Sequence, residues 1–142
     1  MKELKIFKEK YEKVQKRKID SAIINENEFN FVENEIKRKN NKEIKEIKKL
    51  YQAIIDGGDP NIFHTKCDNI PNTLTLIKSV GNRRFRGFTS NSWDSISEYK
   101  NDKNAFLFSL DKKLVYQIKD NCSVYIAIKK MALLSGVVGI FG

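Results

Sequence analysis

The chain holds one pair of side chains whose types and spacing suit nucleophilic chemistry, a histidine and a cysteine three positions apart. His64 and Cys67 would share one face of a helix, and Asp68 follows directly. A thiolate nucleophile needs a base, and the base needs a third group that orients it inside a defined pocket. Histidine and cysteine near a helix end also occur in packed cores. We therefore predict no catalytic residue and no enzymatic activity, and keep a Cys67-dependent reaction as the alternative.

The other polar clusters do not indicate a metal or cofactor site. A zinc site built on His64, Cys67 and Cys122 would need a carboxylate or a second chain as its fourth ligand. The glycines at 57–58 and 136–142 lack the spacing of phosphate-binding loops. Several carboxylates crowd one segment among polar neighbours, where nothing would raise a pKa: Glu26, Glu28, Glu33 and Glu35. The sequence predicts no metal and no cofactor, and it identifies no binding residue.

Alternation of polar and apolar residues predicts the strands that would form the core. The predicted strands cover residues 47–55, 73–80, 84–89, 104–110, 114–119 and 124–128. A two-residue Gly-Asn loop would join the second and third of them and pair Ser79 with Arg84 and Leu76 with Gly87. We expect these strands to form a two-sheet, sandwich-like β core.

Helical signals flank these strands. Residues 1–18 are highly charged, with an apolar stripe at the a/d spacing of a coiled coil, namely Leu4, Phe7, Tyr11 and Val14. After an extended stretch at 19–24, Asn25 and Glu28 form a capping-box pattern that predicts a helix ending near Asn40. The Asp59-Pro60 pair predicts the start of a short helix that runs to about Lys66. In the polar loop after residue 90, Trp93 is predicted to cover the core.

The same residues carry a resemblance to the TLDc domain family. The similarity extends over about residues 19–120 and consists of many short motifs in a fixed order. Those motifs are Asp20 to Ile24, Leu50 to Ala53, Asp56-Gly57, Phe63-His64, Cys67-Asp68, Pro71 to Leu74, Ile77-Lys78, Phe85, Gly87-Phe88, Thr89-Ser90, Trp93 and Ala105 to Leu110. The resemblance implies an α+β fold with an antiparallel β-sandwich-like core flanked by helices, without an established active site.

The resemblance also sets expectations about the domain's ends. We expect a charged helical segment at 1–18 and a TLDc-like domain at 19–142 that lacks the family's usual last strands. That lack would leave a sheet edge unpaired near the C-terminus, with Val137, Val138, Ile140 and Phe141 poorly covered. Arg86 stands where the family commonly has glycine. The isolated chain is therefore expected to be marginally stable and to self-associate, misfold or stay partly molten unless a partner covers this edge. The 4–14 helix and the C-terminal edge are the two surfaces through which it could self-associate.

Charge supplies the competing hypothesis. The formal net charge is +9, and the segments 2–18 and 37–49 each carry +5, which invites binding to nucleic acid or an anionic membrane. Because only five of the 27 basic residues are arginine and no nucleic-acid motif is present, nucleic acid is the less expected partner.

The leading hypothesis is a non-catalytic interaction module. The resemblance implies a cytoplasmic eukaryotic protein that binds a protein partner, with subunits of the vacuolar proton-pumping ATPase as the candidate and oxidative-stress resistance as the setting. Two unpaired cysteines and the absence of a secretory signal also favour a reducing compartment.

Overall fold

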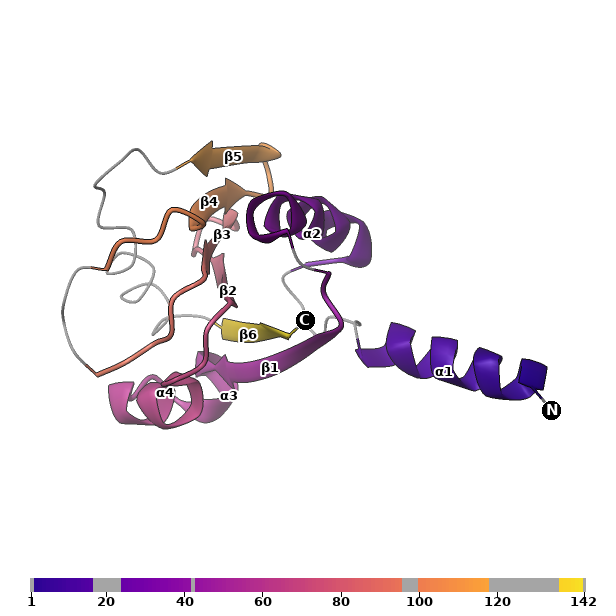
Figure 1. Cartoon of the computed structure of the whole chain (residues 1–142). Coiled ribbons are helices and arrows are strands. Elements are labelled where there is room, and N and C mark those ends of the chain that lie inside the picture. The colour runs from indigo at the N-terminus through magenta and orange to yellow at the C-terminus, as the bar shows by residue number, and fades with distance from the viewer. Residues whose placement is uncertain (1, 17–23, 42, 96–99, 118–135, 142) are drawn as a thin grey trace.

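The computed structural model describes residues 2–16, 24–41, 43–95, 100–117 and 136–141, in which six strands form one sheet and helices lie around it (Figure 1). The elements are α1 (Lys2–Lys16), α2 (Glu26–Asn40), β1 (Glu46–Gln52), α3 (Ala53–Asp56), α4 (Pro60–Cys67), β2 (Thr73–Lys78), β3 (Arg84–Thr89), β4 (Phe106–Ser109), β5 (Leu114–Gln117) and β6 (Gly136–Phe141).

The sheet has the strand order β1-β6-β2-β3-β4-β5, and every neighbouring pair is antiparallel. The α+β class is therefore confirmed. The described strands all belong to this single sheet, so they do not form the two-sheet sandwich that we expected. The strand predicted at 124–128 and most of the extended stretch at 19–24 lie outside the described residues.

Helix α2 begins where its sequence signal places it. The Asn25 side chain accepts a hydrogen bond from the backbone N–H of Glu28 at 2.8 Å, and the Glu28 carboxylate accepts one from the Asn25 N–H at 3.1 Å. This capping box satisfies two N–H groups that have no partner within the helix. The helix ends at Asn41, which adopts the left-handed conformation with φ of 50°. The prediction for this helix is confirmed at both ends, as is that for α4, which is capped by Asp59.

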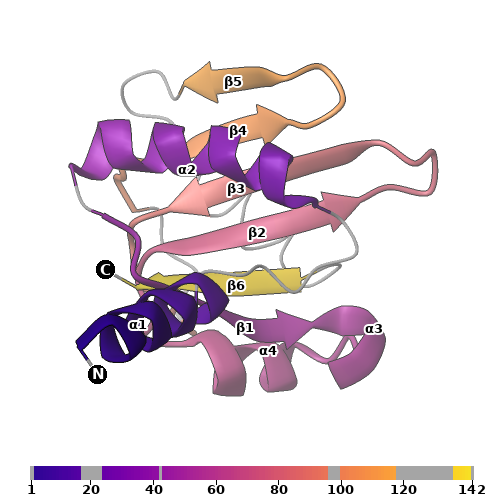
Figure 2. The same ribbon diagram turned by 90° about the vertical axis from the view of Figure 1, so that its right-hand side faces the viewer.

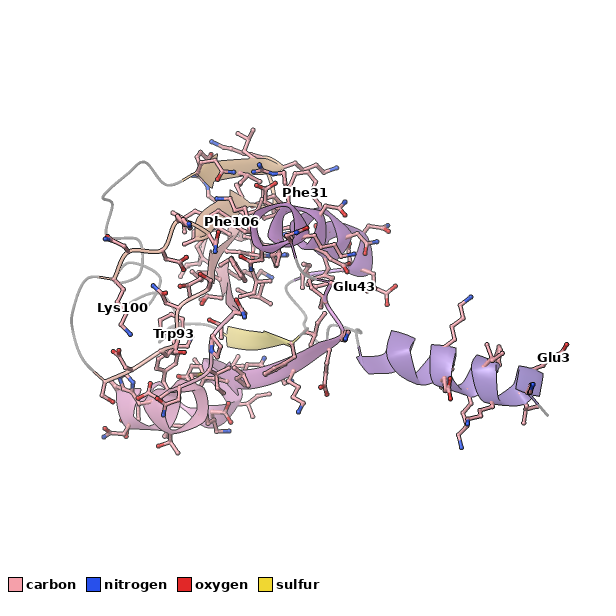
Figure 3. All side chains as sticks on the ribbon, viewed as in Figure 1. Glu3, Phe31, Glu43, Trp93, Lys100 and Phe106 are labelled. Carbon is pink, nitrogen blue, oxygen red and sulfur yellow. The ribbon has the colours of Figure 1, made fainter. Side chains whose placement is uncertain are left out.

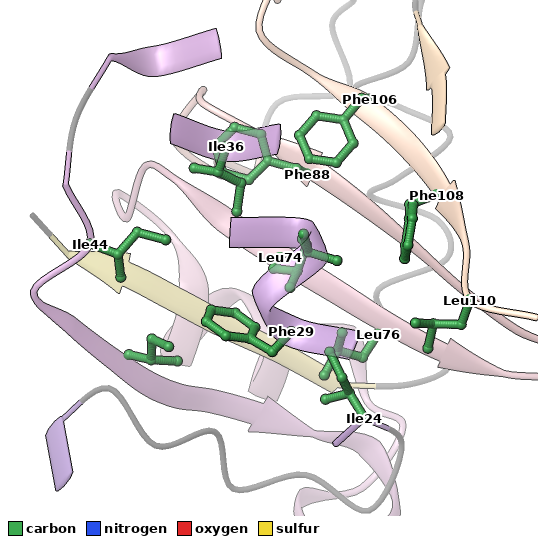
Figure 4. Close-up of a cluster of buried hydrophobic side chains, with 12 residues drawn as sticks. Ile24, Phe29, Ile36, Ile44, Leu74, Leu76, Phe88, Phe106, Phe108 and Leu110 are labelled. Carbon is green, nitrogen blue, oxygen red and sulfur yellow. The ribbon is translucent and has the colours of Figure 1, made fainter. Parts of the chain in front are cut away.

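The main core lies between α2 and one face of the sheet (Figures 2 and 4). Helix α2 contributes side chains at helical spacing, and β2, β3 and β4 contribute every second residue of their length. The buried cluster is Ile24, Phe29, Val32, Ile36, Ile44, Ile47, Leu74, Leu76, Phe88, Phe106, Phe108 and Leu110. Burial of each such side chain stabilises the fold by roughly 1.5–3 kcal/mol, so this face makes the largest apolar contribution to folding.

The hairpin between β2 and β3 has a register one residue away from the predicted one. Ser79 donates its N–H to the Arg83 carbonyl at 2.8 Å, and three residues form the loop, the last of them Asn82 with φ of 59°. Leu76 consequently pairs with Arg86. The two-residue loop was wrong because the left-handed Asn82 closes a three-residue turn instead. The slip places Arg86 on the face that packs against α2.

The first strand is shorter than predicted. Strand β1 ends at Gln52, whose N–H donates to the Asp56 carboxylate at 2.8 Å. That bond closes the single turn of α3, in which Ile54 and Ile55 are 88% and 70% exposed. Their apolar character suggested a continued strand, but the local turn takes them out of the sheet.

The C-terminal segment is not an edge of the sheet, which corrects our expectation of an unpaired C-terminal edge. Strand β6 pairs with β1 on one side and with β2 on the other. The Phe141 carbonyl additionally accepts a hydrogen bond from the N–H of Lys45 at 2.8 Å. The expectation failed because it counted only neighbours along the chain, whereas the residues of β6 pair with residues that lie 60 (136 − 76) to 95 (141 − 46) positions earlier. The backbone of residues 136–141 is thus paired within the chain.

Arg86 is the one charged side chain of the described residues that is buried with its charged group unpaired. It is 1% exposed, and none of its three guanidinium nitrogens has a hydrogen-bond partner. Its guanidinium lies 5.7 Å from the centre of the Phe108 ring. Burial lowers the pKa of Arg86 to about 9, so the group still carries its charge at neutral pH. The nearby Glu28 carboxylate is bound instead to Arg84, at 2.9 Å. A charge held this way opposes folding.

Replacing this arginine by an apolar residue of similar length should stabilise the fold. We expect Arg86→Met to raise the free energy of unfolding by about 1–4 kcal/mol, because the buried charge is removed while the packed stem is kept. Urea unfolding followed by circular dichroism measures the change. The matched control is Arg83→Met, at an exposed position, which should change stability by less than about 0.5 kcal/mol. A less stable Arg86→Met protein would contradict this account and assign a net favourable role to the contact with Phe108.

Candidate functional site

The histidine and cysteine that the sequence suggested have different surroundings. Cys67 is fully buried, in a second cluster with Tyr51, Phe63 and Trp93. The His64 ring instead places its Nδ1 2.9 Å from an Asp68 carboxylate oxygen. Although the two residues lie three apart on α4, the His64 side chain contacts Phe63 and Asp68 and forms no hydrogen bond with Cys67. The suggested pair is therefore not joined as a nucleophile and its base.

The Cys67 thiol is also in the wrong state for a nucleophile. Burial raises its pKa to about 12, with a smaller contribution from the charge of Asp68. The thiol is therefore protonated at neutral pH, whereas cysteine nucleophiles react as thiolates. Cys122, the other cysteine, lies outside the described residues.

His64, Asp68 and Ser95 resemble a catalytic triad in composition but differ from it in order. Asp68 lies in the middle, with His64 on one carboxylate oxygen and the Ser95 hydroxyl donating to the other at 2.9 Å. In a working triad the histidine lies in the middle, because it must take the proton of the serine. Here the carboxylate joins the end of α4 to the loop that follows β3. The arrangement is suited to fixing that loop.

That loop contains Trp93, which confirms the predicted covering role. The Trp93 side chain is fully buried, and its indole N–H donates to the Thr73 hydroxyl at 2.7 Å. Because Thr73 and Leu74 are neighbours on β2, they point to opposite faces. The second cluster therefore lies on the sheet face away from α2. Figure 3 shows Trp93 on the side of the sheet opposite Phe31 of α2.

Asp102 holds the two ends of the same loop together. Its carboxylate accepts hydrogen bonds from the Thr89 hydroxyl at 2.7 Å, from the Ser90 hydroxyl and N–H at 2.6 and 2.7 Å, and from the Asn104 N–H at 3.0 Å. Burial opposes its ionisation, but the bonds from Ser90 and Thr89 outweigh burial, so the pKa of Asp102 lies below its ordinary value.

Among the described residues, a hollow of about 410 Å³ lies on the sheet beside β5. We call it the β3–β5 hollow. It is lined by Phe85, Leu107, Phe108, Tyr116, Ser109, Asp111, Arg83, Arg86 and Lys112. Such a volume is within the range of ligand pockets, about 300–1,000 Å³.

The register of three strands creates the apolar floor of the hollow. Phe85 pairs with Ser109, and Leu107 pairs with Tyr116, so these positions share one face. Phe85 and Leu107 are half-buried, and Tyr116 is 49% exposed. Sequence reasoning missed this site. The polar–apolar alternation of each strand showed which of its residues share a face. Which residues of different strands lie side by side depends on the strand register, which could not be predicted from the sequence.

The rim of the hollow is positively charged. Arg83 and Lys112 are exposed, and neither forms an ion pair with a described residue. Asp111 is also at the rim, but it accepts hydrogen bonds from the Arg84 N–H at 2.8 Å and from its guanidinium at 3.2 Å. Arg84 is shared between Asp111 and Glu28, so Asp111 offsets part of the charge of Arg83 and Lys112, and the rim remains positive overall. An apolar floor with a cationic rim can bind an apolar group that carries negative charge nearby.

Within the described part of the chain we find neither a metal site nor a membrane-spanning helix. There, no three histidine, cysteine or acidic side chains gather in a way that could hold a metal ion. No helix within the same residues is long and apolar enough to span a bilayer.

Native Cys67 should be nearly inert to alkylation. In a Cys122→Ser background, we expect iodoacetamide to modify the folded protein at mildly alkaline pH far more slowly than the urea-unfolded protein. The rise in pKa from 9.0 to about 12 alone lowers the thiolate fraction roughly thousandfold. Mass spectrometry measures both rates, and Cys67→Ser is the unmodifiable reference. Equal rates in the folded and unfolded protein would contradict the buried, protonated thiol.

Loss of the Asp102 carboxylate should destabilise the fold. We expect Asp102→Asn to lower the free energy of unfolding at neutral pH by about 1–3 kcal/mol, since the amide accepts fewer of the bonds. Because the pKa of Asp102 is lowered on folding, its contribution is present above the unfolded pKa near 4 and is lost as pH falls through the folded value.

Thermal melts from neutral to acid pH measure this effect. The wild type should lose stability across that acid window more steeply than Asp102→Asn. Glu9→Gln, at an exposed position on α1, is the control and should follow the wild type. Identical acid profiles for the wild type and Asp102→Asn would exclude the proposed role of the carboxylate.

Comparison with protein-family models matches the TLDc domain to residues 17–139, from just after α1 into β6. A search among curated proteins finds no match. The family match covers most of the chain, and it agrees with the ordered motifs between residues 20 and 110 that form the sheet and α4. The chain therefore belongs to the TLDc domain family.

Proposed function

We propose that this TLDc chain is a non-catalytic protein-interaction module and that its partner binds at the β3–β5 hollow. The observation that carries the proposal is a half-exposed apolar floor beside two exposed cations, Arg83 and Lys112, that form no salt bridge within the described residues. Apolar surface rimmed by polar residues is typical of interaction sites. The groups that could have served catalysis support it too, because Cys67 is buried and protonated and His64 is held by Asp68.

The partner that we propose is the vacuolar proton-pumping ATPase, in the cytoplasm and in the setting of oxidative-stress resistance. TLDc domains as a family are linked to that enzyme and to that resistance, and this family membership is what supports the assignment. The hollow adds a chemical requirement, which is that the contacting segment of the partner presents an apolar side chain next to acidic residues. Aromatic residues at such sites often contribute most of the binding energy, which makes Tyr116 the first residue to test.

Binding to the detergent-solubilised vacuolar ATPase tests the proposal without interference from lipid. We expect the immobilised enzyme to retain the wild-type chain at micromolar concentration and to bind Tyr116→Ser about thirtyfold more weakly, since truncating a central aromatic residue costs about 2 kcal/mol. Lys112→Glu should slow association, with an effect that fades as salt increases. Lys103→Glu, the same charge change at an exposed site outside the hollow, is the matched control.

Two results would count against the proposal in different ways. No retention of the wild type would remove the ATPase as partner but leave the family and the fold unaffected. Retention that is equally strong in Tyr116→Ser and the wild type would place the binding surface outside the hollow. A thermal melt of each variant checks that it is folded before binding is compared.

A further inference from the structure

Helix α1 has an apolar stripe that no described part of the chain covers. Leu4, Phe7 and Tyr11 are 77%, 71% and 58% exposed, and Ile6 is 63% exposed. In Figure 1 the helix extends away from the sheet, with the N-terminus at its far end. The predicted helix is thus confirmed, but no helix among the described residues packs along its stripe as a coiled coil would. The side chain of Val14, the fourth residue of the predicted stripe, is outside those described.

Lysines surround this stripe. Over its 15 residues the helix has six lysines and three glutamates, which gives a net charge of +3 (6 − 3). At 3.6 residues per turn, Lys8 and Lys10 flank the stripe on its two sides, while Lys2 and Lys5 lie on the opposite face. All four are exposed, and none forms an ion pair with a described residue.

In the second basic segment, at 37–49, several cations do have partners within the chain. Lys37 contacts Glu33 at 3.3 Å, and Lys48 contacts Glu46 at 3.7 Å. Lys39 reaches the Ala105 carbonyl and lies 5.6 Å from the centre of the Phe106 ring. Much of the charge of this segment therefore has partners within the chain. Of the two basic segments, α1 is thus the one whose exposed lysines lack an ion-pair partner among the described residues and adjoin exposed apolar side chains.

We propose that α1 is a peripheral membrane anchor that lies in the headgroup region of an anionic bilayer. Leu4, Phe7 and Tyr11 would enter the boundary between headgroups and acyl chains, where aromatic residues are favoured. Lys8 and Lys10 flank them at the depth of the lipid phosphates and can extend toward those phosphates while their stems stay in apolar surroundings. The negative surface complements the net charge of the helix. This anchor goes beyond the protein-binding function and uses a different surface.

Other occupants fit the stripe less well. A second copy would cover it with two heptads, fewer than the three or four that a persuasive coiled coil needs. Nucleic acid would engage the lysines but leave the apolar residues in water, because phosphate contacts need only the charge. An anionic bilayer uses both features of the helix at once.

Flotation of the full chain with protein-free vesicles tests the anchor. We expect binding to vesicles rich in phosphatidylserine and little binding to phosphatidylcholine alone. Raising the salt from about 0.1 M to about 1 M should weaken binding, since the Debye length falls from about 10 to about 3 Å. Phe7→Ser and Lys8→Glu should each reduce the partition constant at least fivefold. The controls are Val80→Ser, which replaces another exposed apolar residue by serine, and Lys103→Glu, which repeats the charge change; both lie outside α1 and should bind as the wild type does.

Several results would overturn the anchor. They are equal binding to both vesicle types, unchanged binding by Phe7→Ser and Lys8→Glu, and no binding to either vesicle at low salt. If vesicles are not bound but light scattering shows a dimer that Phe7→Ser dissociates, the stripe belongs to a second copy. A salt-sensitive shift of DNA without vesicle binding assigns the lysines to nucleic acid. If the chain does not bind the ATPase in the earlier experiment, the vesicle experiment still tests the anchor, because the vesicles contain no protein.

Discussion

The hydrogen bonding of β6 to β1 and β2 joins the two parts of this fold. Strand β1 pairs with β6, and the rest of the sheet continues from the other side of β6 through β2. Because β1 leads directly into α3 and packs near α4, those helices and the Tyr51 cluster depend on the same connection. Gly139 allows the close fit, since a Cβ there would lie 2.8 Å from the Phe141 ring and 3.2 Å from a Leu50 methyl carbon. The sheet thus depends on a pairing between the end of the chain and its middle.

The two faces of this sheet are covered in different ways. Helix α2 covers one face with apolar side chains at helical spacing, and its capping box fixes where that helix begins. The other face is covered in part by α4 and by the loop that Asp102 and Asp68 hold in place through hydrogen bonds. The half-buried carboxylate of Asp102 therefore helps to order this loop. Arg86 differs from these hydrogen-bonded polar groups, because its charged group lies in the apolar layer under α2 without a hydrogen-bond acceptor.

Two exposed surfaces of this domain could bind another molecule. The β3–β5 hollow and the stripe of α1 both combine exposed apolar groups with cations that have no partner among the described residues. They differ in shape, because the hollow is concave and lies on a rigid sheet, while the stripe lies along a helix that extends from the sheet. A concave site suits a projecting side chain of a protein, and an extended helix suits a broad surface.

The sequence determined several features that depend on neighbours along the chain. The capping box of α2, the Asp59-Pro60 start of α4, the strand alternation and the covering role of Trp93 could all be predicted, and the ordered motifs identified the family. The register of the β2–β3 hairpin, the end of β1, the interior place of β6 and the position of Arg86 could not. For the candidate site, sequence reasoning named His64 and Cys67, which form no hydrogen bond with each other, and missed the hollow entirely. The physical reason is that local patterns fix which face of a strand is apolar, whereas strand order and register depend on contacts between distant residues, and a shift of one residue moves a side chain from one face to the other.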